Sequence, residues 1–458
     1  MAVEDCAEGW HAARLIPAVG IRGQEEQEKR ATSSLLAVMH AVPEFGHALL
    51  GPLGAPKGRI ATYAEVQVKD GAGKTHIPDG AIIVERGKVA WRCLVEVKTG
   101  SADLRAEQVN RYLDWARENR LDGVLTISNQ ITASPTDSPV PVDGRKLRTA
   151  RLYHLSWWRI LTEAIVQHRH RGVDDPDQAW LLGELIAYLD DERSGASGFR
   201  DMGESWVKVR NGAGDGTLRA SDRDVREVAE RWEQFVEYLC LGLGQDLGRD
   251  VRAVRPRKQA AAARLDANAA VLASEGVLEA AIKVPDAVGP LLLRADLRTR
   301  KVITSVAIDA PANGRPATRV NWLLRQLKDA PSGLVVELSF ANTKATTAGL
   351  LSAAKGDPQS LLLANDPTRP PRAFRLALSQ SMGTKRGKGE RSFVLETRKQ
   401  AIEFYRNLVQ NLRSWRAAPP KLPEEEPEDA PQTPAPEPPA FTGEGREPTE
   451  ATAVTEAT

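Results

Sequence analysis

Two short stretches of alternating apolar and polar residues, joined by a tight turn, constrain this chain more than any other feature. HIPDGAIIV (76–84) and VAWRCLVEVK (89–98) follow the two-residue period of β-strands, and ERGK between them favours a turn. Alternation places Glu96 and Lys98 on one face of the second strand and the apolar residues between them on the other. If the strands pair as a hairpin, Asp79 approaches the same place from the neighbouring strand. The pattern therefore predicts a sheet with charged groups at one end of adjacent strands.

The segments around this hairpin alternate between helix and strand signals. Residues 23–42 have the spacing of an amphipathic helix, and Glu28 lies seven residues before Leu35 on nearly the same face. A period-2 pattern predicts a strand over 59–70, a helix follows the hairpin at 102–120, and 122–129 predicts another strand. We therefore expect an α/β domain over residues 1–150, ending in a polar, proline-containing loop.

Asp79, Glu96 and Lys98 have side chains suited to metal binding and to phosphate chemistry. Two carboxylates that converge repel each other, and a divalent cation with oxygen ligands, as Mg²⁺ prefers, relieves that repulsion. The ammonium of a nearby lysine can orient an attacking water and offset charge on a phosphate. These residue types at this spacing are what hydrolysis of a phosphodiester requires.

The Pro78-Asp79 and Glu96-Val97-Lys98 pair resembles the motif of the PD-(D/E)XK nuclease superfamily. The predicted order of an acid-bearing helix, three strands, a helix and a strand is similar to the restriction-endonuclease-like fold of that family, over about 110 residues. Gln108 and Tyr112, one helical turn apart, resemble the Gln-x-x-x-Tyr motif of its RecB-like exonuclease branch.

The resemblance implies a role for each matching residue. Asp79 and Glu96 would hold Mg²⁺ or Mn²⁺ together with a backbone carbonyl, that of Val97. The upstream helix would add one more acid, Glu28, with Glu25 as the alternative. Lys98 would position or activate water, and the motif residues of the following helix would orient the strand being cut; the residues expected to be catalytic are Asp79, Glu96, Lys98, Gln108 and Tyr112. The implied activity is a metal-dependent nuclease acting on DNA, in repair, restriction or antiphage defence.

The remainder of the chain divides by composition. Apolar groups at three- and four-residue spacing predict a mainly helical region over 151–248, and mixed strand and helix signals predict an α+β domain over 249–416. Residues 417–458 are rich in proline and acid and cannot bury enough apolar surface to order themselves, so we expect a disordered tail.

The charge is distributed unevenly along the chain. The formal net charge is +1, but ten acidic and two basic residues from Pro419 onward leave about +9 for residues 1–418. Within the α+β region, a glycine-rich segment predicts a loop that follows a phosphate backbone without reading sequence. Its candidate nucleic-acid-binding residues are Lys385, Arg386, Lys388 and Arg391.

Cellular context and partners are predicted only coarsely. Three widely spaced cysteines without C-x-x-C spacing fit a reducing cytoplasm, and no stretch approaches the ~20 apolar residues of a membrane-spanning helix. We expect DNA as the partner, no membrane, and a homodimer or partner protein as possible assemblies. Three alternatives stay open: RNA as the substrate, a main function in residues 250–416, and a catalytically inactive DNA-binding or scaffold protein that keeps the nuclease fold.

Overall fold

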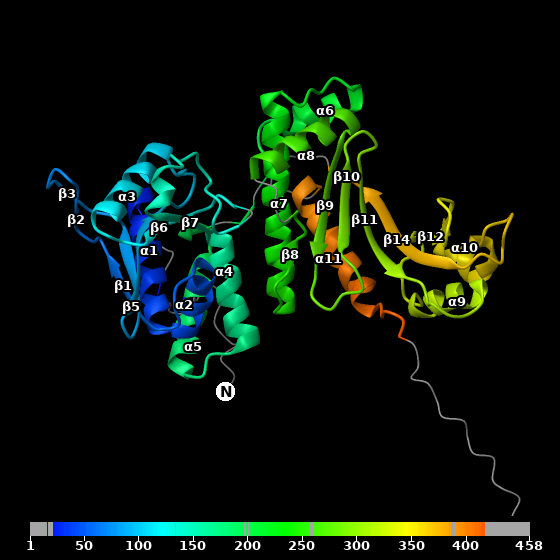
Figure 1. Cartoon of the computed structure of the whole chain (residues 1–458), viewed down its shortest axis with the longest axis horizontal. Helices are drawn as coiled ribbons and strands as arrows, with labels where there is room; N and C mark the ends of the chain where they lie inside the picture. The colour runs from blue at the N-terminus through cyan, green and yellow to red at the C-terminus, as the bar shows by residue number, and fades with distance from the viewer. Residues whose placement is uncertain are drawn as a thin grey trace, which may run out of the picture. The chain divides into compact units, whose positions relative to one another are not determined.

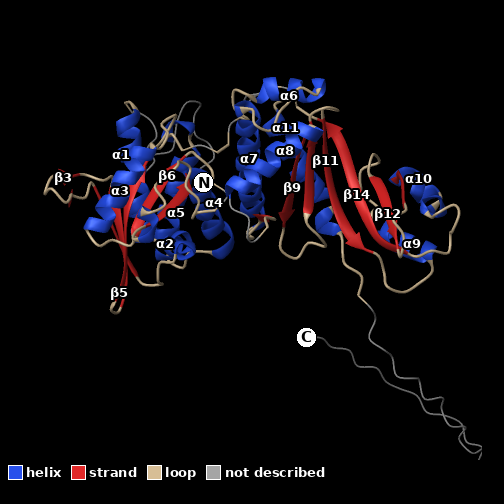
Figure 2. Ribbon diagram, turned by 45° about the horizontal axis from the view of Figure 1, so that its top comes forward, coloured by secondary structure: helices blue, strands red, loops and turns tan. Residues whose placement is uncertain are grey.

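The structure is a computed structural model. It describes residues 16, 22–132, 134–196, 198–199, 201–256, 261–383, 385 and 391–416, and its helices and strands are drawn in Figures 1 and 2. The acidic tail and two of the four basic loop residues, Arg386 and Lys388, lie outside the described residues.

The first sheet is formed in the first part of the chain. Its strand order is β1 (Arg59–Ala64), β4 (Gly80–Arg86), β5 (Val89–Val97), β6 (Gly123–Ser128) and β7 (Arg151–Ser156). The pairs β1/β4 and β4/β5 are antiparallel, and β5/β6 and β6/β7 are parallel. Helix α3 (Ala106–Glu118) makes the crossover between β5 and β6. The predicted succession of helix, strands, helix and strand is confirmed.

The predicted alternation of β5 is also confirmed, because its two faces belong to different cores. Val95 and Val97 pack in a core with α1 (Gln24–Ala41), α2 (Pro43–Leu50), α4 (Trp157–Val166) and α5 (Pro176–Asp190). Leu94 packs on the opposite face, in a core with α3. Helices thus cover both faces of the sheet, and the strand residues are apolar on both faces because both are buried.

The structure differs from the predicted boundaries in three places. The strand predicted over 76–84 begins only at Gly80, so Asp79 lies immediately before β4 and not within it. Strand β7 pairs with β6 and extends the first sheet past residue 150. It runs directly into α4, with the Ser156 hydroxyl accepting the first-turn N–H of Arg159 at 3.1 Å, so no turn residue marks its end. The segment predicted as one strand over 59–70 is broken at Glu65, whose φ of 51° is left-handed. Beyond that break, β2 (Val68–Lys69) pairs with β3 (Thr75–His76) as a separate hairpin.

The second sheet is antiparallel. Its strands, in spatial order, are β13 (Thr346–Leu350), β12 (Val335–Phe340), β14 (Pro371–Ser381), β11 (Lys301–Asp309), β10 (Leu291–Asp296), β9 (Val277–Lys283) and β8 (Arg252–Ala253). The helices that pack with it are α6 (Trp206–Asp215), α7 (Arg223–Leu247), α8 (Ala261–Glu275), α9 (Pro316–Gln326), α10 (Leu351–Gly356) and α11 (Phe393–Asn407). The strands and helices predicted for the α+β region are present (Figure 2).

Short helical turns complete the described elements. They are η1 (Gly51–Leu53), η2 (Lys146–Arg148), η3 (Gln167–Arg171), η4 (Glu192–Ser194), η5 (Pro358–Leu361) and η6 (Val409–Asn411). Within the described ranges, no helix combines the length and the apolar character needed to cross a membrane.

A buried histidine on β7 makes the stability of the fold pH-dependent. His154 Nε2 lies 2.7 Å from the carbonyl oxygen of Gln130, which can only accept, so this nitrogen carries the proton. Nδ1 lies 3.0 Å from the Thr126 hydroxyl. Burial, together with the charge of Arg159, lowers the pKa of His154 to about 4, and the imidazole is neutral in the folded protein.

We predict that His154 lowers the stability of the folded protein at acidic pH. Between pH 6.5 and about 4 the unfolded chain takes up a proton at His154 that the folded protein does not, so stability falls as the pH drops through this window. Between pH 7 and 4.5 the wild-type protein should lose about 2–3 kcal/mol more unfolding free energy than the His154→Gln variant. Urea unfolding of both proteins at the two pH values measures this difference, and identical pH slopes would contradict it.

Candidate active site

The β4–β5 hairpin brings Asp79 and Glu96 together. Gly80, the first residue of β4, is opposite Val95, so Asp79, immediately before the strand, comes next to Glu96. The Asp79 carboxylate accepts the backbone N–H of Val97 at 2.7 Å. Glu96 is 1% exposed, and such a buried carboxylate requires partners.

The ammonium of Lys98 is the centre of the site. Nζ lies 2.9 Å from a carboxylate oxygen of Glu96 and 3.2 Å from one of Glu28. It also donates to the carbonyl oxygen of Val97 at 3.0 Å. A positive charge is therefore held by oxygens from β5 and from α1.

Helix α1 contributes Glu28 to this group and not Glu25, the alternative from the sequence. Glu28 is mostly buried and reaches Lys98. Glu25 is exposed, and its carboxylate pairs with Lys29 at 3.1 Å on the solvent side of the helix. The two acids are three residues apart, yet they face different surroundings.

Helix α3 brings both residues of the Gln-x-x-x-Tyr motif to Glu96. The amide nitrogen of Gln108 donates to the Glu96 carboxylate oxygen that also contacts Lys98. Tyr112 is 5% exposed, and burial, then the charge of Glu96, raise the pKa of its hydroxyl well above the usual value. Tyr112 is therefore neutral and keeps its proton beside the carboxylates.

The carboxylate of Glu96 affects the protonation of its neighbour Asp79. Burial and the charge of Glu96 raise the pKa of Asp79 to about 6, against the opposing effects of the Val97 N–H and the Lys98 charge. Burial acts to lower the pKa of Lys98, but the surrounding acids Glu96, Glu28 and Asp79 outweigh it, and the net pKa is raised. Lys98 is thus an ammonium ion.

The donor atoms of this site are suited to a divalent cation. In the part of the chain that the structure describes, no group of three or more His, Cys, Asp or Glu side chains is arranged to hold a metal ion. However, Glu28, Glu96 and the Val97 carbonyl already place oxygens around a cation, the Lys98 ammonium. Carboxylate and carbonyl oxygens are the ligands that Mg²⁺ takes, and these three are among the predicted metal ligands.

Several residues that the sequence did not single out hold the lysine end of β5 in place. The indole N–H of Trp157 donates to the carbonyl of Lys98 at 2.9 Å. The Thr99 hydroxyl donates to Gln27 at 3.0 Å, and the N–H of Gly100 donates to Gly195 at 2.9 Å. Their partners lie far away in sequence, so no local pattern indicates them.

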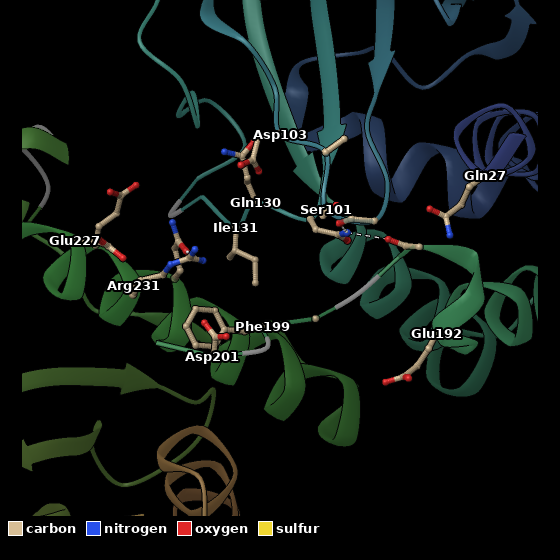
Figure 3. A pocket seen from close by; sticks show the side chains of 17 residues that line it. Gln27, Ser101, Asp103, Gln130, Ile131, Glu192, Phe199, Asp201, Glu227 and Arg231 are labelled. Atoms are coloured by element: carbon tan, nitrogen blue, oxygen red, sulfur yellow. Dashed lines mark hydrogen bonds between the residues drawn. The ribbon is translucent and has the colours of Figure 1, made fainter. Parts of the chain in front are cut away.

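A pocket of about 550 Å³ opens beside this end of β5. Its lining includes Gln27 of α1, the loop from Gly100 to Asp103, and the α7 residues Glu227 and Arg231 (Figure 3). Five carboxylates line it against one guanidinium: Asp103, Glu192, Asp201, Glu227 and Glu230, with Arg231. The pocket is therefore acidic.

The basic loop predicted to bind nucleic acid is described only in part. Lys385 and Arg391 are both exposed. The backbone N–H of Lys385 donates to the carbonyl of Arg391 at 3.1 Å, so the two residues lie together at the base of the loop. Its role stays a prediction.

The chain matches none of the protein-family models and none of the curated proteins with which it was compared. Its function must therefore be inferred from the residues of the site.

We predict that Lys98 stabilises the metal-free protein. Replacing Lys98 with Met leaves the buried Glu96 carboxylate without its cation, and breaking such a pair costs about 3 kcal/mol. Lys29→Met is the matched control, because Lys29 pairs with the exposed acids Glu25 and Glu65, and such solvent-screened pairs contribute little to stability. Urea unfolding in EDTA compares the two variants. Equal small losses of unfolding free energy would show that the Glu96–Lys98 ion pair does not stabilise the fold.

Proposed function

We propose that this protein is a magnesium-dependent nuclease that hydrolyses phosphodiester bonds in DNA, with a restriction-endonuclease-like domain built on the first sheet. The observation that carries the proposal is the group around Lys98. Glu28, Glu96 and the Val97 carbonyl gather around one cation, and Asp79 lies beside them with a raised pKa. A carboxyl group whose pKa is raised by burial and by a charged neighbour, as that of Asp79 is, is a frequent feature of catalytic sites.

The proposed metal is held by Asp79, Glu96, Glu28 and the Val97 carbonyl. When bound, Mg²⁺ acts as a Lewis acid that polarises the phosphate and lowers the pKa of a bound water. The Lys98 ammonium contacts three of these four groups and so holds their oxygens near one another.

The remaining side chains have separable tasks in this proposal. The Lys98 ammonium orients the attacking water and offsets the negative charge on the phosphate. The water oxygen loses a proton to solvent and forms a new bond to phosphorus, the P–O bond to the leaving oxygen breaks, and the leaving oxygen takes up a proton from solvent. Gln108 positions the Glu96 carboxylate by donating to it, and the neutral Tyr112 remains a proton donor beside it.

A second candidate is the catalytically inactive nuclease-fold protein that binds DNA or acts as a scaffold. One observation favours it: the Lys98 ammonium already supplies the buried carboxylates with a counter-charge. A fold that had lost catalysis could keep this ion-pair group for stability alone. The two candidates differ in metal binding and cleavage: the nuclease requires both from these residues, and the inactive protein requires neither.

Cleavage assays with paired glutamate variants test the proposal. We expect wild-type protein to cut DNA with Mg²⁺ or Mn²⁺ and not with EDTA. Asp79→Asn and Glu96→Gln should abolish cleavage, and Glu28→Gln should reduce it roughly 10–100-fold, as loss of a supporting ligand does. Glu25→Gln, on the solvent side of the same helix, should keep full activity. Circular and linear DNA distinguish endonuclease from exonuclease activity.

The inactive candidate makes the opposite prediction for the same proteins. DNA binding without cleavage under any metal, together with no Mg²⁺ binding by calorimetry, would contradict the nuclease proposal. Equal activity of the Glu28→Gln and Glu25→Gln variants would remove Glu28 from the site.

A further inference from the structure

Two large apolar side chains are exposed on either side of Asp79. Tyr63 is 49% exposed and Ile77 is 62% exposed. Ile77 precedes Asp79 by two residues. Tyr63 precedes Glu65 by two, and the backbone N–H of Glu65 donates to the Asp79 carbonyl at 3.0 Å. Exposed apolar groups beside a charged site need an apolar partner to be useful.

Tyr63 lies on the same face of the first sheet as Glu96. Its neighbour Thr62 bonds to Leu36 of α1, so alternation turns Tyr63 to the opposite face, the one that α3 covers at β5. Tyr63 pairs with Ala81, two residues beyond Asp79 on β4. From strand spacing, the Cα atoms of Tyr63 and Asp79 are about 8 Å apart, so the ring is a near neighbour of the site.

This part of the sheet face is left open. Leu94 is 1% exposed beneath α3, whereas Tyr63, on the edge strand β1, stays accessible. Along β1, β4 and β5, alternation also puts the exposed Arg59, Arg92 and Glu85 on this face, with Glu85 opposite Arg59. The open strip therefore combines an aromatic ring with two cationic groups and one acid, and an aromatic ring beside cationic groups is typical of surfaces that bind single-stranded nucleic acid.

Ile77 is held firmly at the rim of this strip by the β2–β3 hairpin. The ring of His76 stacks on Trp115 of α3 with centroids 4.3 Å apart. The hairpin is further tied to α3 through Gly71, whose N–H donates to Glu118 at 3.0 Å. The exposure of Ile77 thus belongs to a segment fixed by contacts on both sides.

The other flank of the site is unsuitable for a polyanion. The pocket beside Gly100 carries five carboxylates against one guanidinium, and Figure 3 shows Glu227 and Asp103 among its labelled lining residues. Phosphates are repelled from such a surface. A nucleic-acid strand that reaches Asp79 and Glu96 is therefore directed over β1 and β4.

We infer that the substrate is single-stranded at the site, with a base stacked on Tyr63 and Ile77 inserted beside the next base. In an intact duplex the bases are stacked on one another, so contact with these side chains first costs unstacking; a single strand or a frayed end offers a base face without that cost. This inference rests on the proposed nuclease function and names its substrate class.

Binding without cleavage tests the inference separately from the nuclease activity. Labelled oligothymidine and a duplex of matched length are titrated in EDTA, followed by fluorescence anisotropy. Tyr63→Ala should weaken binding of the single strand roughly tenfold, and Ile77→Ala should also weaken it. Tyr63→Phe should retain binding because the ring is kept. Trp180→Ala is the control, since Trp180 is 56% exposed on α5 and has no place in the strip.

The outcomes separate the two proposals. Unchanged single-strand binding by Tyr63→Ala, or an equal loss for Trp180→Ala or for the duplex, overturns the stacking inference even if the protein cuts DNA. A selective loss for Tyr63→Ala that Phe rescues supports it, even if no metal gives cleavage and the nuclease proposal fails. All these side chains are exposed, and urea unfolding verifies that the variants remain folded.

Discussion

The burial of Glu96 is the constraint on which the rest of the site depends. A carboxylate with 1% exposure at the end of a central strand is tolerable only with compensating partners, and the structure supplies them from two directions. Gln108 arrives from α3 on one face of the sheet, while Lys98 connects the same carboxylate to Glu28 on α1. The partners of this one buried carboxylate thereby link α3 on one face of the sheet with α1 on the other.

Strand alternation made the centre of this site predictable from sequence. The period of β5 places Glu96 and Lys98 together, and the short turn before it brings Asp79 close, because a hairpin leaves little freedom of register. Helix periodicity favoured Glu28, which lies on nearly the same face as Leu35, and left Glu25 as the alternative. The packing of α1 on the sheet places Glu28 against Lys98 and leaves Glu25 exposed.

Other features could not be predicted, because they depend on contacts between segments that are distant in sequence. Strand β7 has no turn residue before α4, so its apolar sequence could not be divided into strand and helix. Tyr63 and Ile77 each belong to a segment predicted as a strand, 59–70 and 76–84. Their exposure depends on where α3 ends and on the break at Glu65. The acidic pocket is lined by residues spread over 207 positions of the chain, from Gln27 to Gln234, for which the chain carries no local signal.

The contact of Trp157 with the Lys98 carbonyl has a consequence for how the site is assembled during folding. Lys98 is tied to residues 70 positions before it, through Glu28, and 59 positions after it, through Trp157. Contacts of such long sequence separation form late, since the loops between them must close first. A fragment that ended at residue 150 would contain every predicted catalytic side chain and yet lack β7 and Trp157. During synthesis, the site should therefore become ordered only after α4 has left the ribosome.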